Sequence, residues 1–245
     1  MNAFVDIHCH ALFGVDDGAP DEITMCEMLR SSYEDGTRAL CFTPHCSAEY
    51  MPSSASVDEA FAKAEQYCKA YLPEMQLYLG NELSYCIEGI KMLAEGQCKT
   101  LAGTRYVLLD FFTVPDAVAI VQSVKAMQNA GYIPVVAHAE RYGCFHKDKK
   151  MLDRLHETGA LLQVNAASLF GGVFSPVRRT ARRLLSKQQA YVIASDGHDL
   201  QVRPPRLSKA YQLVEKKYGE QYAQLLFFEN PSRILSGKKI NSPGR

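Results

Sequence analysis

The chain has 245 residues, of which 47% are hydrophobic and 22% are charged, and its 27 basic residues balance its 27 acidic ones. This balance argues against a general nucleic-acid-binding protein, because phosphate contacts dominate the affinity of such proteins and require a basic excess. No apolar run approaches the roughly 18 residues that span a bilayer, so we expect no membrane span. The amino terminus has no basic stretch followed by an apolar one, so we expect no signal peptide and a cytoplasmic location.

The eight cysteines do not have the spacing of a disulfide scaffold or of a zinc site. No Cys-x-x-Cys pair occurs, and no cysteine begins the Cys-x5-Arg loop that binds phosphate in cysteine-dependent phosphatases. A cytoplasmic protein keeps its thiols reduced. We therefore expect most of these cysteines to be small buried hydrophobic residues.

Short apolar runs alternate with longer amphipathic segments along almost the whole chain, which is typical of β-α units that form a parallel sheet. The apolar runs are rich in Val, Ile, Leu and Tyr and show no clean polar alternation, as expected of strands that are covered on both faces. The sequence therefore predicts an α/β fold. The seven expected strands span Ala3–His8, Ala39–Thr43, Gln76–Gly80, Tyr106–Asp110, Ile133–His138, Ala160–Asn165 and Ala190–Asp196.

Helices are expected in the segments between these strands. Asp21 is a candidate N-cap of the first helix, and Gly36 is a candidate residue for its end. The other expected helices span Val57–Leu72, Pro115–Ala130, 148–158, 176–187, 206–218 and 220–228. We expect one domain over residues 1–236. Residues 237–245 lack apolar periodicity, so we expect a flexible tail there.

Six of the seven expected strands lead into a histidine, an aspartate or a glutamate. Parallel α/β proteins gather their functional side chains at the carboxyl ends of the strands, so these side chains should meet at one face of the protein. The residues are His8 and His10 after the first strand, His45, Glu82, Asp110 and His138 after the next four, and Asp196 and His198 after the last.

These side chains have the chemistry of metal ligands. Imidazole and carboxylate groups without thiolates suit zinc, manganese or iron rather than a structural zinc site. His8 and His10 are two residues apart and therefore point the same way from an extended strand. The ligands are too many for one ion, so the sequence predicts two or three ions, with Glu82 as a candidate bridge. Ions about 3.5–4 Å apart can hold a hydroxide between them and clamp the oxygens of a phosphoryl transfer.

Other polar residues near these positions have competing interpretations. In the segment Gly14-Val15-Asp16-Asp17-Gly18, either aspartate could be a ligand, or the pair could form an ordinary turn. Arg141 and Arg203 each follow a candidate ligand closely, where a guanidinium can bind phosphate oxygens instead of being a surface charge. His146 and His156 are expected on a loop and a helix and are interpreted as structural.

Seven motifs occur in the chain in a characteristic order. They are Asp6-Ile7-His8-Cys9-His10, Asp16-Asp17-Gly18, Thr43-Pro44-His45, Gly80-Asn81-Glu82, Ala137-His138-Ala139-Glu140-Arg141-Tyr142, Ser195-Asp196-Gly197-His198 and Arg203-Pro204-Pro205. Together they resemble the manganese-dependent bacterial tyrosine-protein phosphatases of capsular and exopolysaccharide synthesis, which belong to the polymerase and histidinol phosphatase (PHP) superfamily. The His-x-His motif alone is shared with the amidohydrolases, whereas the combination of motifs is much more specific.

The resemblance implies a distorted seven-stranded β/α barrel, of the TIM-barrel-like PHP type, with a three-metal site. It implies manganese, whereas the ligand set alone also allows zinc or iron. Carried over by position, the first metal would use His8, His10, Glu82 and Asp196, the second Glu82, Asp110 and His138, and the third Asp17, His45 and His198. The family aligns its ligand with the second aspartate of the pair, which selects Asp17 over Asp16. Arg141 and Arg203 match the family's phosphate-contacting arginines.

The chain departs from the family pattern at three places. It has Asp110-Phe111-Phe112 where the family usually has Glu-Phe-Pro, and the aspartate is one methylene shorter. Ser84 stands where an arginine is common, and Ala139 replaces the proline of His-Pro-Glu-Arg. These changes bear on the substrate more than on the chemistry.

The resemblance implies hydrolysis of phosphotyrosine by a metal-activated hydroxide. The implied partner is a phosphotyrosine protein, the tail of a cognate bacterial tyrosine kinase that regulates capsule or exopolysaccharide synthesis. A phenoxide leaving group, with a parent pKa near 10, needs less acid assistance than an alkoxide, which fits a site without an obvious general acid.

Two alternatives stay open from the sequence. The first is another phosphoesterase on the same scaffold, such as a histidinol-phosphate phosphatase or a nuclease-type phosphodiesterase. The second is a regulatory homologue that keeps the barrel and has lost turnover. An amidohydrolase normally has a single aspartate on the last strand, whereas here His198 accompanies Asp196.

Overall fold

The strands form two parallel sheets. The computed structural model describes residues 3–47, 51–85, 88–112 and 116–243. Its strands are β1 (Phe4–Cys9), β2 (Thr37–Phe42), β3 (His45–Cys46), β4 (Gln76–Leu79), β5 (Glu82–Ser84), β6 (Tyr106–Asp110), β7 (Ile133–Val136), β8 (Leu161–Asn165) and β9 (Ala190–Ala194). The sheets have the orders β1-β2-β4 and β3-β5-β6-β7-β8-β9, and their pairings are parallel. The predicted α/β fold is therefore confirmed.

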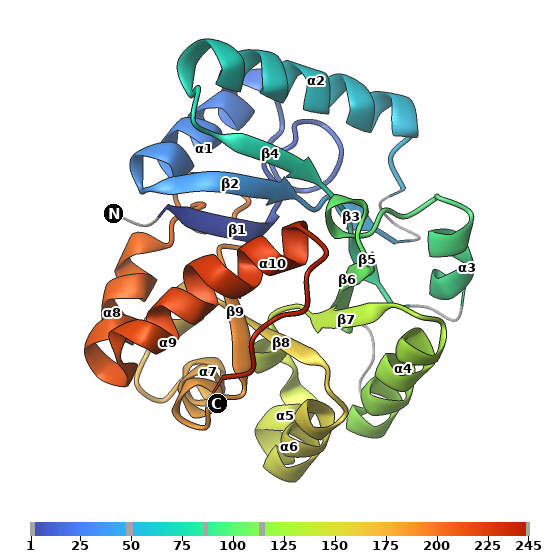
Figure 1. Ribbon diagram of the computed structural model, residues 1–245, viewed down its shortest axis with the longest axis vertical. Helices are drawn as coiled ribbons and strands as arrows, with labels where there is room; N and C mark the ends of the chain where they lie inside the picture. Colours follow the sequence, from blue (N-terminus) through green and yellow to red (C-terminus); the bar gives the residue numbers. More distant parts are fainter. Residues whose placement is uncertain (1–2, 48–50, 86–87, 113–115, 244–245) are drawn as a thin grey trace.

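Helices cover the outside of the strands (Figure 1). They are α1 (Glu22–Glu34), α2 (Ser54–Tyr71), α3 (Gly89–Ala94), α4 (Ala117–Asn129), α5 (Gly143–Lys147), α6 (Lys149–Glu157), α7 (Pro176–Ser186), α8 (Ser208–Tyr218), α9 (Glu220–Gln224) and α10 (Asn230–Leu235). Short 3₁₀ turns η1 (Leu101–Gly103), η2 (Ala139–Arg141) and η3 (Ala166–Leu169) lie between them, and the π-helix η4 (Leu225–Glu229) joins α9 to α10.

The expected helices occur with small shifts at their ends. Asp21 caps α1 as predicted, because its carboxylate accepts a hydrogen bond from Thr24 N at 2.8 Å. The second helix begins earlier than expected because the Ser53 hydroxyl accepts from Ser56 N and supplies its cap. The expected start of the α4 segment, Pro115, lies outside the described residues. The helices α3 and α5 were not predicted, and the helical segment expected over 220–228 continues through α10.

Two of the seven expected strands, Ala39–Thr43 and Gln76–Gly80, are each followed by a short strand that the sequence did not predict. β2 ends before Thr43-Pro44 and the chain resumes at β3, because proline has no N–H to donate to a ladder. The third expected strand corresponds to β4, and β5 follows it after Gly80 and Asn81. Pairing continues across both breaks, since Gly80 N donates to Phe42 O at 2.9 Å and Glu82 N donates to Pro44 O at 3.2 Å.

The two sheets also approach each other at β1 and β9. A parallel bridge joins Cys9 to Gly197, with His10 N donating to Gly197 O at 2.8 Å and Asp196 N donating to His8 O at 2.9 Å. This contact brings the first and last candidate ligand segments of the chain side by side, although they are separated by almost the full sequence.

One apolar cluster holds the two sheets together. It includes Ile7 of β1, Leu108 of β6 and Val192 of β9, all fully buried. Ile234 and Leu235 of α10 complete the cluster. The interior between the strands is therefore filled with side chains, and polar groups are left for the strand ends.

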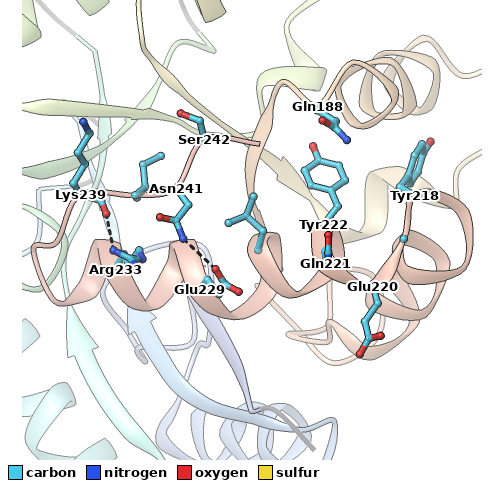
Figure 2. A pocket seen from close by; sticks show the side chains of 13 residues that line it. Gln188, Tyr218, Glu220, Gln221, Tyr222, Glu229, Arg233, Lys239, Asn241 and Ser242 are labelled. Carbon is cyan, nitrogen blue, oxygen red and sulfur yellow. Dashed lines mark hydrogen bonds between the residues drawn. The ribbon is translucent and has the colours of Figure 1, made fainter. Parts of the chain in front are cut away.

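The segment expected to be a flexible tail has defined partners as far as Asn241. Tyr106 Oη donates to Lys238 O at 2.8 Å, and Asn241 N donates to Asn230 Oδ1 at 2.9 Å. Arg233 donates to Lys239 O at 3.0 Å (Figure 2). The segment makes these contacts through its backbone atoms. Such contacts do not depend on apolar side chains, so the sequence shows no apolar periodicity there. Together with α9, η4 and α10, the segment lines a groove of about 1170 Å³.

No helix in the described ranges has both the length and the apolar character to cross a membrane.

Replacing Leu108 by Ala should destabilise the protein by about 2–5 kcal/mol, because it removes buried methyl groups from the cluster between the sheets and leaves a cavity. The control is Val118→Ala, since Val118 is exposed on α4 and its loss should change the free energy of unfolding by no more than about 0.5 kcal/mol. Urea unfolding of both variants checks this prediction. Equal effects would contradict the proposed position of Leu108.

Candidate metal centre

The structure brings the predicted ligands from both sheets into one cluster. Three groups of side chains each have one ligand atom per residue, all within 4.8 Å of one another, a geometry that could hold an ion. The entry group, named for its exposed member Asp17, contains His10, Asp17, His45 and His198. The central group contains His8, His10 and Glu82. The Asp110 group contains Glu82, Asp110 and His138. His10 and Glu82 each belong to two groups, so the three groups are continuous.

Glu82 lies at the middle of the cluster. Its Oε2 is 3.4 Å from the Nε2 atoms of His8 and His10 and 3.0 Å from His45 Nδ1, and its Oε1 is 2.8 Å from His138 Nε2. Parallel pairing places His45 directly beside Glu82. Burial alone raises the pKa of this carboxyl, but the surrounding imidazoles lower it well below its usual range.

The orientation of these atoms fits bound cations better than a hydrogen-bonded network. Glu82 Oε2 is fully buried and makes no well-directed hydrogen bond within the described part of the chain, despite the nitrogens around it. The Nε2 atoms of His8 and His10 face each other at 3.1 Å. Imidazole nitrogens and an unsatisfied carboxylate oxygen that converge in this way are suitable ligands for a divalent ion.

Asp196 extends the central group. Its Oδ1 lies 3.3 Å from His8 Nε2 and 3.6 Å from His10 Nε2. The backbone of Asp196 is left-handed, with φ of 54°, and so is that of His138, with φ of 33°. Such conformations are costly for residues other than glycine and concentrate at functional sites. They also explain why β7 and β9 end before the predicted His138 and Asp196.

The two adjacent aspartates have different places. Asp17 Oδ1 lies 3.2 Å from His45 Nε2 and 3.4 Å from His198 Nε2, within the entry group. Asp16 instead accepts hydrogen bonds from His10 Nδ1 at 2.7 Å and from the backbone N–H of Gly18 and His45 at 3.0 Å. Asp16 therefore fixes the His10 ring so that its Nε2 faces the cluster.

Two buried polar residues of β8 support the cluster, and the strand-end pattern does not predict the first of them. Gln163 Oε1 lies 3.2 Å from His8 Nδ1 and accepts from His138 N at 2.8 Å. Asn165, at the end of the sixth expected strand, donates to Asp196 Oδ2 at 2.6 Å. The available signal was the alternation Gln163-x-Asn165 in an otherwise apolar strand, because alternate residues share a face.

Asp110 is also held by its neighbours. Its Oδ1 accepts from Tyr142 Oη at 3.1 Å and from Phe112 N at 2.9 Å, and lies 4.0 Å from His138 Nε2. Burial and the nearby Glu82 raise the pKa of this carboxyl. Ser84, at the position where an arginine is common, pairs in register with Asp110.

The two predicted arginines lie at the edge of the cluster. Arg141 donates to Asp196 Oδ2 at 3.1 Å, and Arg203 Nη2 lies 3.7 Å from Asp17 Oδ2. Both arginine side chains are more than one-third exposed. They line a cavity of about 220 Å³ together with Asn165, Ser168 and Asp196.

The two histidines interpreted as structural lie outside the three groups. His146 is on the short helix α5 rather than on a loop, and its Nε2 lies 2.7 Å from Glu140 O. His156, on α6 as expected, stacks on Tyr191 with 5.7 Å between the ring centroids.

Replacing Gly18 by Ala should lower Mn²⁺ affinity by about 10- to 100-fold, as does loss of groups that orient ligands. A Cβ at this position would overlap the carbonyl oxygen and Cβ of His10. His10, or the loop that carries Asp17 and residue 18, must then move. Gly143→Ala is the control, because its Cβ would meet no atom within 4 Å. Titration calorimetry of the metal-free proteins measures the difference. Unchanged affinity would show that His10 does not need this loop.

Comparisons with known proteins agree with this arrangement. The chain is 29% identical over 242 residues to the tyrosine-protein phosphatase CpsB of Streptococcus pneumoniae, covering 96% of this chain and 100% of the relative. It is 31% identical over 240 residues to the tyrosine-protein phosphatase YwqE of Bacillus subtilis, covering 96% and 93%.

A solved structure shows the same fold. A chain from the crystal structures of YwqE and CpsB, described as unique metal-dependent tyrosine phosphatases, superposes with a TM-score of 0.88 at 30% identity and 98% coverage of both chains. The profile of the family described as capsular polysaccharide synthesis, CpsB/CapC, matches residues 4–236. This chain therefore belongs to the CpsB/CapC family.

Proposed function

We propose that this chain is a metal-dependent protein-tyrosine phosphatase. The observation that carries the proposal is the convergence of three metal-capable groups beside a cavity lined by Arg141 and Arg203. Phosphoryl transfer depends on positioned positive charge, and this site supplies it from cations and from guanidinium groups. The similarity to relatives named tyrosine-protein phosphatases, over nearly the whole chain, supports the same activity.

We infer three manganese ions, one for each group. His8, His10, Glu82 and Asp196 would hold the first, Glu82, Asp110 and His138 the second, and Asp17, His45 and His198 the third. When bound, the cations would supply Lewis acidity to the phosphoryl group and to water. Bridging by Glu82 is supported by its two oxygens, which face different groups. Asp110 has a shorter side chain than the glutamate usual in the family. The hydrogen bond from Tyr142 Oη holds its carboxylate near His138.

The remaining residues position the reactants. Arg141 and Arg203 would bind the phosphoryl oxygens, because each guanidinium reaches the cavity while paired with a carboxylate of the cluster. Asp16 and Gln163 hold the rings of His10 and His8 through their Nδ1 atoms and direct the Nε2 atoms inward. A phenoxide leaving group makes a strong acid unnecessary.

The strands are interpreted as a distorted seven-stranded barrel. In this interpretation β2 with β3, and β4 with β5, each count as one member, because hydrogen bonds continue across both breaks. The bridge between Cys9 and Gly197 would close the ring between β1 and β9.

The proposed partner is a phosphotyrosine protein, with the tail of a cognate bacterial tyrosine kinase as the candidate. The capsular polysaccharide synthesis description of the family supports this context. The cytoplasmic location and the single domain over residues 1–236 stay predictions from the sequence.

Hydrolysis of para-nitrophenyl phosphate and of a phosphotyrosine peptide should stop when a chelator removes the metal and return when manganese is added. Histidinol phosphate and single-stranded DNA, assayed in parallel, test the alternative phosphoesterases. Activity that survives complete metal removal would refute the mechanism. Full metal binding without turnover of any substrate would support the regulatory homologue instead.

His138→Ala should lower kcat/KM for para-nitrophenyl phosphate by at least about 100-fold, because it removes a ligand and not only an outer partner. The matched control is His156→Ala, which removes a histidine that stacks on Tyr191 outside the cluster. It should leave kcat/KM nearly unchanged. A similar loss in both variants would indicate general destabilisation.

Manganese binding to the metal-free protein should strengthen as the pH rises towards about 9. Burial by itself lowers the pKa values of His45 and His138. Hydrogen bonds to Asp17 and Glu82 outweigh burial for His45, and Glu82 does so for His138, so both pKa values rise to about 9. A metal binds the neutral imidazole, so below that pH each ring must release a proton. The apparent affinity should rise up to about tenfold per pH unit for each proton released. Calorimetry in buffers of different ionisation enthalpy detects the protons, and pH-independent affinity would contradict their release.

A further inference from the structure

Large hydrophobic side chains are exposed on two loops at the carboxyl ends of the strands. The loop between η3 and α7 presents Phe170, Val173 and Phe174, with exposed fractions of 50%, 72% and 88%, and the loop after β9 presents Val202, at 80%. We call these four side chains the apolar rim. Exposed large apolar side chains are typical of surfaces that another molecule covers.

The first of these loops is held in place by its own hydrogen bonds. Arg178 donates to Gly171 O at 2.8 Å, and Ser175 N donates to Gly172 O at 2.9 Å. Ser175 Oγ caps α7 by accepting from Arg178 N at 3.3 Å. The backbone is therefore organised while its aromatic side chains point into solvent, which lowers the entropic cost of binding a partner.

Both loops adjoin the cavity that contains the two arginines. Ser168 and Val177, which line the cavity, lie on either side of the first loop in the sequence. On the second loop, Val202 immediately precedes Arg203, which also lines the cavity. The cavity is therefore lined by two arginines, and the loops that carry the apolar rim begin or end at residues that line it.

The size of the cavity indicates what these side chains contact. At about 220 Å³ it is smaller than a typical drug-sized ligand pocket, which begins near about 300 Å³. It can admit a phosphoryl group, but the rest of a polypeptide substrate must lie on the surrounding loops. The charges select the occupant, because Arg141 and Arg203 complement an anionic phosphoryl group.

We propose that the apolar rim binds hydrophobic side chains that flank the phosphotyrosine of the polypeptide substrate. This inference rests on the proposed phosphatase function. The rim would select among phosphotyrosine segments by their neighbours and would contribute nothing to the reaction of a small aryl phosphate. It is thus a specificity surface, separate from the groups that bind metal and phosphate.

The test uses the full chain with Phe170→Ser and Phe174→Ser combined, and with Phe174→Ser alone. The control is Tyr71→Ser, an exposed aromatic residue, 69% exposed, at the end of α2 that leads to the start of β4. Substrates are para-nitrophenyl phosphate and two phosphotyrosine peptides that differ only in having leucine or serine beside the phosphotyrosine. Circular dichroism verifies folding.

We expect the double variant to lose about tenfold in kcat/KM on the leucine peptide, mainly through KM, as expected for one or two apolar contacts. Its activity on para-nitrophenyl phosphate and on the serine peptide should stay within about twofold of the parent protein. The Tyr71→Ser control should behave as the parent protein with all three substrates. An equal loss on all substrates, or no loss on the leucine peptide, would overturn the proposal.

Direct binding separates this proposal from the phosphatase assignment. Fluorescence anisotropy of the labelled leucine peptide should show weaker binding to the double variant even where turnover is not observed. Peptide binding that depends on the rim, without hydrolysis, would refute the phosphatase function and retain the rim. If sedimentation shows that the double variant changes only self-association, the rim is an interface between two copies and the proposal is wrong.

Discussion

The buried carboxylate of Glu82, surrounded by four imidazoles, is the interaction on which the site depends. The imidazoles of His8, His10, His45 and His138 all lie within 3.4 Å of its oxygens. An isolated charge at this depth would be strongly unfavourable, because burial removes its hydration. Compensation must come from protonated imidazoles in the metal-free protein or from cations, and this requirement links proton binding to metal binding.

The strand ends can hold these groups because apolar residues fill the space beneath them. The cluster that contains Ile7 and Leu108 fixes the two sheets relative to each other, and α10 covers it with Ile234 and Leu235. Above that layer, Gln163 and Asn165 occupy buried positions on β8 and connect His8, His138 and Asp196 through hydrogen bonds. The ligands are thus oriented by a rigid scaffold, which lowers the cost of assembling the site.

Two hollows of the molecule differ in character. The small cavity beside the metal-capable groups contains Arg141 and Arg203 and borders exposed apolar loops. The larger groove in Figure 2 is formed by α9, η4, α10 and the segment up to Ser242. Its charged side chains already have partners, because Arg233 donates to Lys239 O and Glu229 accepts from the Asn241 side chain. Size alone therefore does not identify the functional site, whereas the chemistry of the lining does.

Local sequence patterns were enough to predict the α/β class, most element positions and the residue types that gather at the strand ends, because periodicity and strand-end chemistry are local properties. Tertiary structure decided the rest. Long-range packing added the short strands β3 and β5 and gave the expected tail partners through Asn241. It also separated Asp16 from Asp17 by the direction in which each side chain points. It also revealed Gln163, because a neutral side chain supports His8 only through a contact between residues 155 positions apart. Contacts of that separation depend on how strands register and sheets meet, which no local pattern encodes.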